Sequence, residues 1–400
     1  MPASSHPTTI RWGVLGTARI ALNQVIPAIQ QVASAELIAI ASRDADKARA
    51  TAARFSIPKA FGSYEALLEA PDIDAVYIPL PNALHAPWTI RAAQAGKHVL
   101  CEKPLALNAS QAGEMIAACR EQGVQLAEAF MYRHHPQIAQ ALERVRTGEI
   151  GTPRLIRGSF SFELNRPDDV RWDPALGGGA LLDVGCYPVS AARLMFGAEP
   201  VKALAAATFT PRGVDETLAG LLVFPGERYA LVDCSFRLPL RQGLEIMGTA
   251  GRITLPWPYN PGSRPTTITL VRGDEETTIT VPPANSYALM VEAFNDALLS
   301  RRPLPYPSED AQAGAGYAGD SGHIVRWGLE ILRCAMTSAN IESFSDLEWR
   351  VAWRFFAALR MTSASPADLN VHKRRHAPAQ GNAGIVQVNG DAVNDVPPAL

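Results

Sequence analysis

The stretch Lys97-His98-Val99-Leu100-Cys101-Glu102-Lys103-Pro104 runs from an apolar segment directly into a carboxylate, an ammonium group and a proline. The pattern predicts a buried strand that ends near Glu102. In open parallel sheets, ligands bind at the carboxyl ends of the strands. Lys103 would then reach a bound substrate from a fixed backbone. The alternative is that Lys103 is a solvated lysine in a loop. The rest of the sequence distinguishes between the two interpretations.

Short apolar runs alternate with helical patterns on both sides of this stretch. The runs begin near Ile10, Glu36, Ile73 and Val124, and helices of about ten to fifteen residues fit between them. This alternation predicts an α/β fold with a doubly wound parallel sheet of the Rossmann type. We expect this dinucleotide-binding domain to cover residues 10–130, after an N-terminal tail of residues 1–9.

A glycine turn follows the first apolar run, as a dinucleotide site requires. The turn reads G-x-A-x-x-A, with an alanine in place of the second glycine. The helix that begins there offers free N–H groups and a positive dipole end to a pyrophosphate. The alternative is a strand–helix turn that binds nothing. The expected contacts are Gly16, Thr17, Ala18, Arg19 and Ile20.

The second apolar run ends in Ser42-Arg43-Asp44. An acid at this strand end suits the ribose 2′-OH of NAD, whereas an arginine suits the 2′-phosphate of NADP. Arg43 is a planar, permanently charged fork for phosphate oxygens, and Ser42 can add a donor. The sequence therefore favours NADP, with NAD possible. In the alternative reading, Arg43 pairs with Asp44 or Asp46 on the surface and Asp44 binds the ribose.

The histidines near these strand ends carry a weaker signal. His85 stands where the third strand becomes a helix, so it would either touch the nicotinamide or only cap the turn. His134 and His135 are adjacent, with no cysteine or acid at metal-ligand spacing. No metal site is therefore expected.

From about Ile150 the pattern changes to successive β-runs separated by glycine and proline turns. This change predicts a C-terminal α+β domain with a mainly antiparallel, open sheet. Such a sheet can present one face to a second subunit. We expect residues 131–311 to form this substrate and oligomerisation domain.

One helix is inserted among these strands, directly after Gly177-Gly178-Gly179. Asp183 and Tyr187 are four residues apart, which predicts that they lie on one helix face. An acid near a helix N-terminus is also simply favourable for the dipole, and a tyrosine is often core. Together, behind three glycines, they indicate a site. Arg171 and Trp172, just before the glycines, are candidates for lining it.

Taken together, five motifs resemble the glucose–fructose oxidoreductase, inositol dehydrogenase and rhizopine catabolism (Gfo/Idh/MocA) family, in the family's order over roughly residues 10–310. They are Gly16-Thr17-Ala18-Arg19-Ile20-Ala21, Leu80-Pro81-Asn82-Ala83-Leu84-His85, Gly96-Lys97-His98-Val99-Leu100-Cys101-Glu102-Lys103-Pro104, Glu128-Ala129-Phe130-Met131-Tyr132-Arg133, and residues 177–187. Some members carry histidine where Tyr187 stands. The chain is thus more similar to the branch of glucose–fructose oxidoreductase, D-xylose dehydrogenase and trans-dihydrodiol dehydrogenase.

The resemblance implies a nicotinamide cofactor and hydride transfer at a CH–OH carbon of a sugar, such as a xylose-like aldose, or of a cyclic diol. It implies that Lys103 is the catalytic lysine and Asp183 the acid of the catalytic helix. Further cofactor contacts are implied at Pro81, Asn82, His85, Glu102, Lys103 and Glu128. It also implies a homo-oligomer formed through the open sheet.

Removing a hydride from a CH–OH carbon requires that the hydroxyl proton also leaves. We expect Tyr187 to exchange this proton, Lys103 to polarise the oxygen, and Asp183 to orient both. The alternative is that Lys103 itself takes the proton, since burial can move the pKa of a lysine toward neutrality. Two other functions stay open: an NAD(P)H-dependent keto-sugar reductase, and a non-catalytic regulator that senses the dinucleotide.

Composition excludes several classes of partner. The 400 residues carry a formal net charge of -2, which gives no electrostatic reason to expect nucleic acid or a membrane surface. The five cysteines are odd in number and widely spread, as in a reduced, cytoplasmic protein. The N-terminus lacks the pattern of a signal peptide, and no apolar run is long enough to span a bilayer.

Residues 312–400 depart from the family pattern. Two aromatic-rich stretches, near residues 324–336 and 347–361, predict helices, and the composition after about residue 363 predicts disorder. We expect either a genuine C-terminal extension or the product of a reading-frame change.

Overall fold

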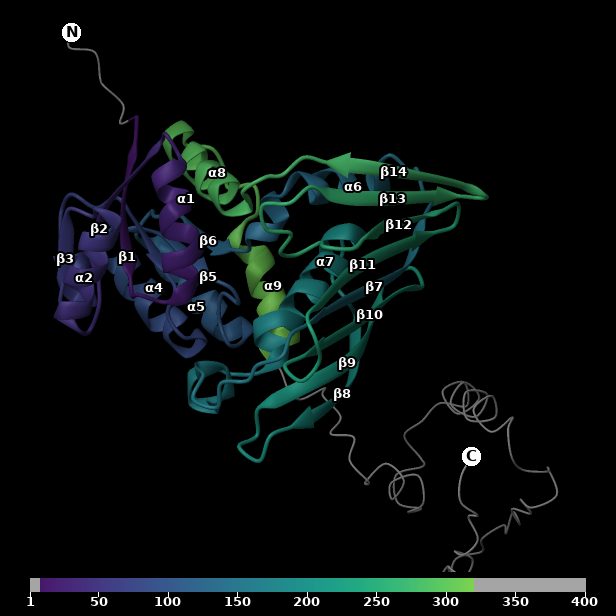
Figure 1. Cartoon of the computed structure of the whole chain (residues 1–400), viewed down its shortest axis with the longest axis horizontal. Coiled ribbons are helices and arrows are strands. Elements are labelled where there is room, and N and C mark those ends of the chain that lie inside the picture. The colour runs from purple at the N-terminus through teal and green to yellow at the C-terminus, as the bar shows by residue number, and fades with distance from the viewer. Residues whose placement is uncertain (1–7, 320–400) are drawn as a thin grey trace, which may run out of the picture. The chain divides into compact units, whose positions relative to one another are not determined.

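The computed structural model describes residues 8–319, which contain two β-sheets with helices between and beside them (Figure 1). The first sheet has six parallel strands in the order β3-β2-β1-β4-β5-β6. The strands are β1 (Ile10–Leu15), β2 (Ala35–Ala41), β3 (Lys59–Phe61), β4 (Ala75–Ile78), β5 (His98–Glu102) and β6 (Leu126–Ala129). The order reverses between β1 and β4, so the ends of these strands mark the switch point where ligands bind. The predicted Rossmann sheet is confirmed.

Helices connect these parallel strands and cover the sheet. They are α1 (Ile26–Gln31), α2 (Ala45–Phe55), α3 (Tyr64–Leu68), α4 (His85–Gln94) and α5 (Ala109–Glu121). Side chains cap several of them; for example, Asn108 accepts a hydrogen bond from the Gln111 amide at the start of α5. Each such cap satisfies an amide that the helix itself leaves unpaired.

The second sheet has eight strands in the order β14-β13-β12-β11-β7-β10-β9-β8. Only β7 and β10 pair in parallel among these neighbours, so the predicted mainly antiparallel sheet is confirmed. The strands are β7 (Pro153–Ser161), β8 (Lys202–Phe209), β9 (Asp215–Phe224), β10 (Arg228–Ser235), β11 (Arg241–Gly248), β12 (Arg252–Leu255), β13 (Thr266–Arg272) and β14 (Glu275–Val281).

Two helices, α6 (Pro136–Arg146) and α7 (Cys186–Phe196), pack on the face of this sheet that is turned toward the first sheet (Figure 1). No helix of residues 8–319 covers the opposite face. Apolar side chains are exposed there: Leu204, Tyr229 and Leu231 each keep at least 41% of their surface accessible. Leu231 lies in register with Leu221, which in turn is paired with Leu204.

The last two described helices return to the Rossmann sheet. Helix α8 (Ser286–Ser300) packs against α1, and α9 (Ser308–Gly319) packs against α5. Asp310 of α9 forms ion pairs with Arg133 and Arg193, one at each oxygen of its carboxylate. None of the helices in this part of the chain is long and apolar enough to span a membrane.

The expected division between two domains, at residues 130 and 131, falls between β6 and a short helix, Met131–His134. These domain boundaries stay predictions. The first eight residues of the expected extension, 312–319, belong to α9. Its remainder, including the predicted helices and the predicted disorder, lies outside the described residues, as does most of the N-terminal tail.

Helix α8 is fixed to the first strand by a buried polar network, and this network generates a prediction. The Trp12 Nε1 donates to Asn295 Oδ1 at 3.2 Å, and Asn295 Nδ2 donates to the carbonyl of Ser34 at 2.9 Å. Replacing Asn295 with alanine leaves the fully buried Trp12 Nε1 without a hydrogen bond, whereas the Ser34 carbonyl still accepts the Ile10 amide at 2.9 Å. We expect the free energy of unfolding, measured by urea titration, to fall by about 1–3 kcal/mol.

The matched control is Glu292→Ala, on the exposed face of the same helix. This change should move the free energy of unfolding by less than about 0.5 kcal/mol. Equal effects of the two substitutions would contradict the role given to the buried network.

Candidate active site

Lys103 follows β5 immediately and reaches across to the second half of the chain. Its Nζ donates to Asp183 Oδ1 at 2.9 Å and to the Asp183 carbonyl at 2.6 Å. Arg171 Nε donates to the other carboxylate oxygen of Asp183 at 2.6 Å. Two residues that the sequence placed at separate strand and helix ends, Lys103 and Asp183, are therefore in direct contact, and Arg171 joins them.

The pKa values in this cluster follow from its charges. Burial alone would raise the pKa of the Asp183 carboxyl, but Lys103 and Arg171 together hold it well below its usual range. Burial alone would lower the pKa of Lys103, but Asp183, Cys186 and Glu102 together outweigh burial, and the net pKa is raised. The structure thus differs from the expectation that burial moves Lys103 toward neutrality, because its carboxylate partner is too close.

Asp183 lies in a π-helical turn, Leu181–Gly185, that precedes α7. The sequence spacing assumed an α-helix, in which residues four apart share a face. A π-turn is wider, and such turns occur frequently at functional sites. Asp183 and Tyr187 nevertheless line the same cleft.

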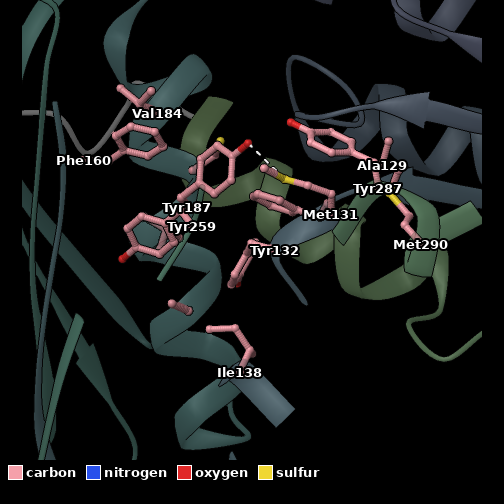
Figure 2. Packing of buried hydrophobic residues seen from close by; sticks show 14 of the residues in the cluster. Ala129, Met131, Tyr132, Ile138, Phe160, Val184, Tyr187, Tyr259, Tyr287 and Met290 are labelled. Atoms are coloured by element: carbon pink, nitrogen blue, oxygen red, sulfur yellow. Dashed lines mark hydrogen bonds between the residues drawn. The ribbon is translucent and has the colours of Figure 1, made fainter. Parts of the chain in front are cut away.

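Tyr187 is surrounded by aromatic rings (Figure 2). Its ring lies 4.9 Å from that of Phe130 and 5.2 Å from that of Phe160, between ring centroids, and the Lys103 Nζ is 5.3 Å from the ring centroid of Tyr187. Its hydroxyl donates to the Met131 Sδ at 3.7 Å. Burial raises the pKa of Tyr187 well above its ordinary value. Asp183 therefore orients Lys103 directly, whereas the Tyr187 hydroxyl has another partner.

Glu102 fixes the backbone at the start of the lysine turn. Its Oε2 accepts the Lys103 amide at 3.1 Å, and its Oε1 accepts the Tyr77 hydroxyl at 2.6 Å. Burial raises the pKa of the Glu102 carboxyl, although Lys103 opposes the rise. Glu102 also lines the cleft.

His85 and Glu128 fix the rest of this turn. The two ring nitrogens of His85 lie 2.8 Å from the carbonyl oxygens of Pro104 and Leu80, and the residue is fully buried. Glu128 Oε1 accepts the Leu105 amide at 2.9 Å. Neither side chain lines the main cleft. His85 and Glu128 therefore hold the turn that carries Lys103. Both were expected to contact the cofactor, and neither lies at the surface of the cleft.

The glycine turn after β1 has the geometry of a phosphate cradle. Gly16 has a φ of +112°, which favours glycine, and a side chain there would press on Leu80. No side chain caps the helical segment that follows, and its Leu22 amide donates to the Ala18 carbonyl at 3.1 Å, so an anion at this turn would be bound by the amides that precede Leu22. Ala18, Arg19 and Ile20 line the cleft. The residues present therefore fit a dinucleotide pyrophosphate.

At the end of β2, Arg43 is exposed and lies close enough to the Tyr64 hydroxyl to oppose the rise in pKa that burial causes there. Asp44 is used as the cap of α2: its Oδ1 accepts the amides of Asp46 and Lys47. The Ser42 hydroxyl accepts the Asp44 amide at 3.2 Å. Within residues 8–319 no ion pair joins Arg43 to Asp44 or Asp46, and the guanidinium lies within hydrogen-bond reach of the Tyr64 hydroxyl.

These elements enclose a cleft with a volume of about 860 Å³. Pro81 and Asn82 line it from the first sheet, and Asn82 Nδ2 donates to the Gly177 carbonyl at 2.8 Å. Gly177 has a φ of +74°, and a side chain there would collide with Leu107. Gly177 thus permits a close approach between the two halves of the chain, whereas Gly178 and Gly179 lie against Arg171 and Asp215 of the second half. In the described part of the chain, no group of His, Cys, Asp and Glu side chains is arranged to bind a metal ion.

Of the two residues before the glycines, only Arg171 lines the cleft. Trp172 is buried instead, with its ring 5.2 Å from that of Phe236 and the Arg237 guanidinium 4.8 Å above it. The burial of an apolar indole against a neighbouring ring accounts for this position, which the sequence did not indicate.

Several cleft residues escaped the sequence analysis. They are Met131, Phe160, Phe162, Arg166, Asp169, Gln242, Trp257, Asn260, Arg264 and Tyr287. Tyr287, Val291, Phe294 and Leu298 recur at helical spacing, a pattern that by itself indicates only a face packed in the core. Figure 2 shows the hydroxyl end of Tyr287 directed toward the space that the Tyr187 hydroxyl also faces. Trp257 and Arg264 lie on a proline- and glycine-rich connection, and an aromatic residue in such a loop was the available signal.

Comparison with known proteins identifies both halves of the chain. Residues 10–130 match the model of an oxidoreductase family with an NAD-binding Rossmann fold, and residues 138–254 match that of the GFO/IDH/MocA C-terminal domain. The chain is 44% identical over 290 residues to D-xylose 1-dehydrogenase (NADP(+)) 2 of Haloferax volcanii, covering 72% of this chain and 88% of the relative.

A second relative is the dTDP-3,4-didehydro-2,6-dideoxy-alpha-D-glucose 3-reductase of Streptomyces violaceoruber, 38% identical over 339 residues, with 83% of this chain and 95% of the relative covered. Among solved structures, a 3-ketoreductase from Actinomadura kijaniata in complex with NADP and TDP-benzene matches with a TM-score of 0.74 and 35% identity. The match covers 80% of this chain and all of that one.

The position of Glu128 leads to a prediction about stability and pH. Burial raises the pKa of its carboxyl to about 7, against the opposing effect of Arg133. A carboxyl with a raised pKa stabilises the fold fully below its unfolded pKa of about 4.3, and this contribution is lost as the pH rises through about 7. Between pH 5 and pH 8.5, the free energy of unfolding of the wild type should therefore fall by up to about 3 kcal/mol more than that of Glu128→Gln. Urea unfolding of both proteins measures this difference.

Glutamine keeps the size and the acceptor oxygen of Glu128 but does not titrate. The comparison therefore isolates the effect of the ionisation of Glu128 on stability. The matched control is Glu121→Gln at the exposed end of α5. Parallel stability curves for the wild type and Glu128→Gln across this pH range would contradict the prediction.

Proposed function

The chain belongs to the Gfo/Idh/MocA family and is an NAD(P)-dependent oxidoreductase that acts on CH–OH groups. We propose that it transfers a hydride between NADP and a carbon atom of a sugar. The observation that carries the proposal is the contact of Lys103 with Asp183 inside the cleft. It brings the end of a Rossmann strand, where the nicotinamide half of a dinucleotide would lie, to the helix of the second sheet.

NADP is the proposed cofactor. The turn at residues 16–20 would hold the pyrophosphate, and Arg43, with Ser42 beside it, would bind the 2′-phosphate. The use of Asp44 as a helix cap supports this preference, because its Oδ1 is already engaged by two amides. When bound, NADP supplies or accepts the hydride. The NADP(+)-dependent name of the Haloferax relative and the NADP-bound Actinomadura structure support the same choice.

Lys103 and Tyr187 are the proposed catalytic pair. Lys103 is held as an ammonium group by Asp183, so it can stabilise negative charge that develops on the substrate oxygen. Tyr187 would exchange the proton with that oxygen, after its hydroxyl leaves the weak contact with Met131. Lys103 as the proton acceptor is less well supported, because its raised pKa keeps it charged. Asp183 acts through Lys103 as a positioning residue.

The proposed substrate is a sugar that presents a CH–OH group, such as a xylose-like aldose, or a related cyclic diol. The 44% identity to a D-xylose dehydrogenase supports this class. A second candidate is the reduction of a keto-sugar. It is favoured because raised pKa values keep both Lys103 and Tyr187 protonated, which is the state that donates to a carbonyl oxygen. The 3-reductase relatives support that direction.

We also propose that two copies of the chain associate through the uncovered face of the second sheet. The exposed Leu204, Tyr229 and Leu231 form an apolar patch there, with Leu221 between the first and third. Apolar patches on an open sheet are typical of association surfaces. A second copy would bury them without covering the cleft-lining helix α7, which lies on the opposite face.

We propose a cytoplasmic location because the cysteines of the described residues form no disulfide. Cys101, Cys119, Cys186 and Cys234 are all buried and unpaired. Burial raises the pKa of Cys119 and of Cys186 to about 12, so these thiols are poor nucleophiles and serve packing. Unpaired thiols are usual where the redox environment is reducing.

The reaction is tested by following NADPH spectrophotometrically with a panel of aldoses, trans-dihydrodiols and keto-sugars, in both directions. Lys103→Met and Tyr187→Phe should each lower kcat by about 100-fold or more, because each removes a group that acts on the transition state. Lys59→Met, an exposed lysine that pairs with Asp72 outside the cleft, is the control. Unchanged turnover in Lys103→Met would reject the assignment, whichever direction is faster.

Arg43 provides a test of cofactor choice. Arg43→Ala should raise KM for NADP about 10- to 100-fold, because a charge-assisted contact with the 2′-phosphate is lost. KM for NAD should stay within about twofold, since NAD has no such phosphate. Lys47→Ala, an exposed cation on the neighbouring helix, is the control. A similar rise for both cofactors would show that Arg43 is not the phosphate reader.

A further inference from the structure

The connection between β12 and β13 is held by hydrogen bonds at four consecutive residues, 257–260, of which Trp257 and Asn260 line the cleft. The side chain of Gln137, which is fully buried, donates to the carbonyls of Trp257 and Pro258 at 2.8 and 3.3 Å. Gln242 Oε1 accepts the amides of Tyr259 and Asn260 at 3.2 and 2.9 Å. These hydrogen bonds order residues 257–260, whereas residues 262–265, including Arg264, are exposed. Ordering part of a loop in advance lowers the cost of binding.

This loop presents an arginine stacked on an indole. The guanidinium carbon of Arg264 lies 4.5 Å from the ring centroid of Trp257, and Arg264 Nε donates to the Pro261 carbonyl at 3.0 Å. Both side chains line the cleft. The stack and the Nε contact fix the plane of the guanidinium, and its two terminal nitrogens remain to bind a ligand.

The charge of Arg264 is not balanced by a carboxylate. Two other arginines of the cleft are neutralised: Arg166 pairs with Asp169, and Arg171 pairs with Asp169 and Asp183. Within residues 8–319, Arg264 has no acidic partner at ion-pair distance. In the same described part of the chain, Arg19 at the glycine turn is also without an acidic partner, so Arg264 is the one such arginine that the second half of the chain contributes to the cleft.

We propose that Arg264 and Trp257 form a subsite for a phosphate group carried by the substrate, so that the substrate is a phosphorylated sugar or a sugar nucleotide. This inference rests on the proposed function and narrows its substrate class. A guanidinium fork binds phosphate oxygens through two parallel hydrogen bonds, which a neutral sugar hydroxyl cannot match. The indole fixes the fork and offers an aromatic face to a nucleoside base.

The phosphates of the cofactor have a separate site. The glycine turn at Gly16 and the side chain of Arg43 belong to the first sheet and its connections, whereas Trp257 and Arg264 belong to the second sheet. An anion bound at Arg264 therefore comes from the second substrate. Measuring binding to the protein already saturated with NADP separates the two sites.

The experiment is isothermal titration of the full chain, saturated with NADP, with three probes: thymidine diphosphate, glucose 1-phosphate and D-xylose. We expect Arg264→Gln to weaken binding of the phosphate-bearing probes about tenfold or more, the loss of one charge-assisted contact of about 1.4 kcal/mol. Binding of D-xylose and KM for NADP should change less than about twofold. Arg264→Lys should recover only part of the loss, because an ammonium group lacks the planar fork.

Arg154→Gln is the matched control, since Arg154 is an exposed arginine of the same sheet that donates to a backbone carbonyl and lies outside the cleft. A loss with thymidine diphosphate alone assigns the subsite to a sugar nucleotide, and a loss with both phosphate probes assigns it to a phosphate ester in general. Unchanged affinities in Arg264→Gln would overturn the inference, as would a wild type that binds neither phosphate probe. Turnover of free sugars would then still support the proposed function.

Discussion

The contact between Lys103 and Asp183 is the interaction on which the site depends. It joins the end of a strand of one sheet to a helix that packs on the other, and Arg171 completes the charge balance. Breaking such a buried pair is costly because it leaves an uncompensated charge in a poorly solvated place. The ion pair therefore fixes both walls of the cleft and the protonation state of the lysine at once.

The arrangement of the fold was largely predictable because hydrophobic periodicity reports local structure. Alternating strands and helices indicated the parallel sheet, and closely spaced β-runs indicated the antiparallel one. The candidate residues Lys103, Asp183 and Arg171 also came from local patterns, and the structure brings them into contact. The ends of predicted strands indicate candidate site residues, because ligands of open α/β sheets bind at the carboxyl ends of the strands.

The other features of the site could not be predicted from the sequence, because they depend on contacts between segments that are distant in the chain. The spacing that marks Tyr287 as a core residue is the same for a cleft residue on a buried helix face. The raised pKa of Lys103 follows from a carboxylate 80 positions away in the chain, and no local pattern reports that distance. For the same reason, Trp172 and Arg171 are neighbours in sequence but face different surroundings.

His85 shows what this geometry demands of the fold. A neutral imidazole carries a single N–H, yet both ring nitrogens of His85 lie 2.8 Å from carbonyl oxygens. A second proton would satisfy both carbonyls, but it would place a cation in a fully buried position near Lys103, and burial with that neighbour lowers the pKa of the ring. The turn beneath the proposed catalytic lysine is thus frustrated: a neutral His85 ring leaves one carbonyl without a donor, and a protonated ring places a buried cation near Lys103.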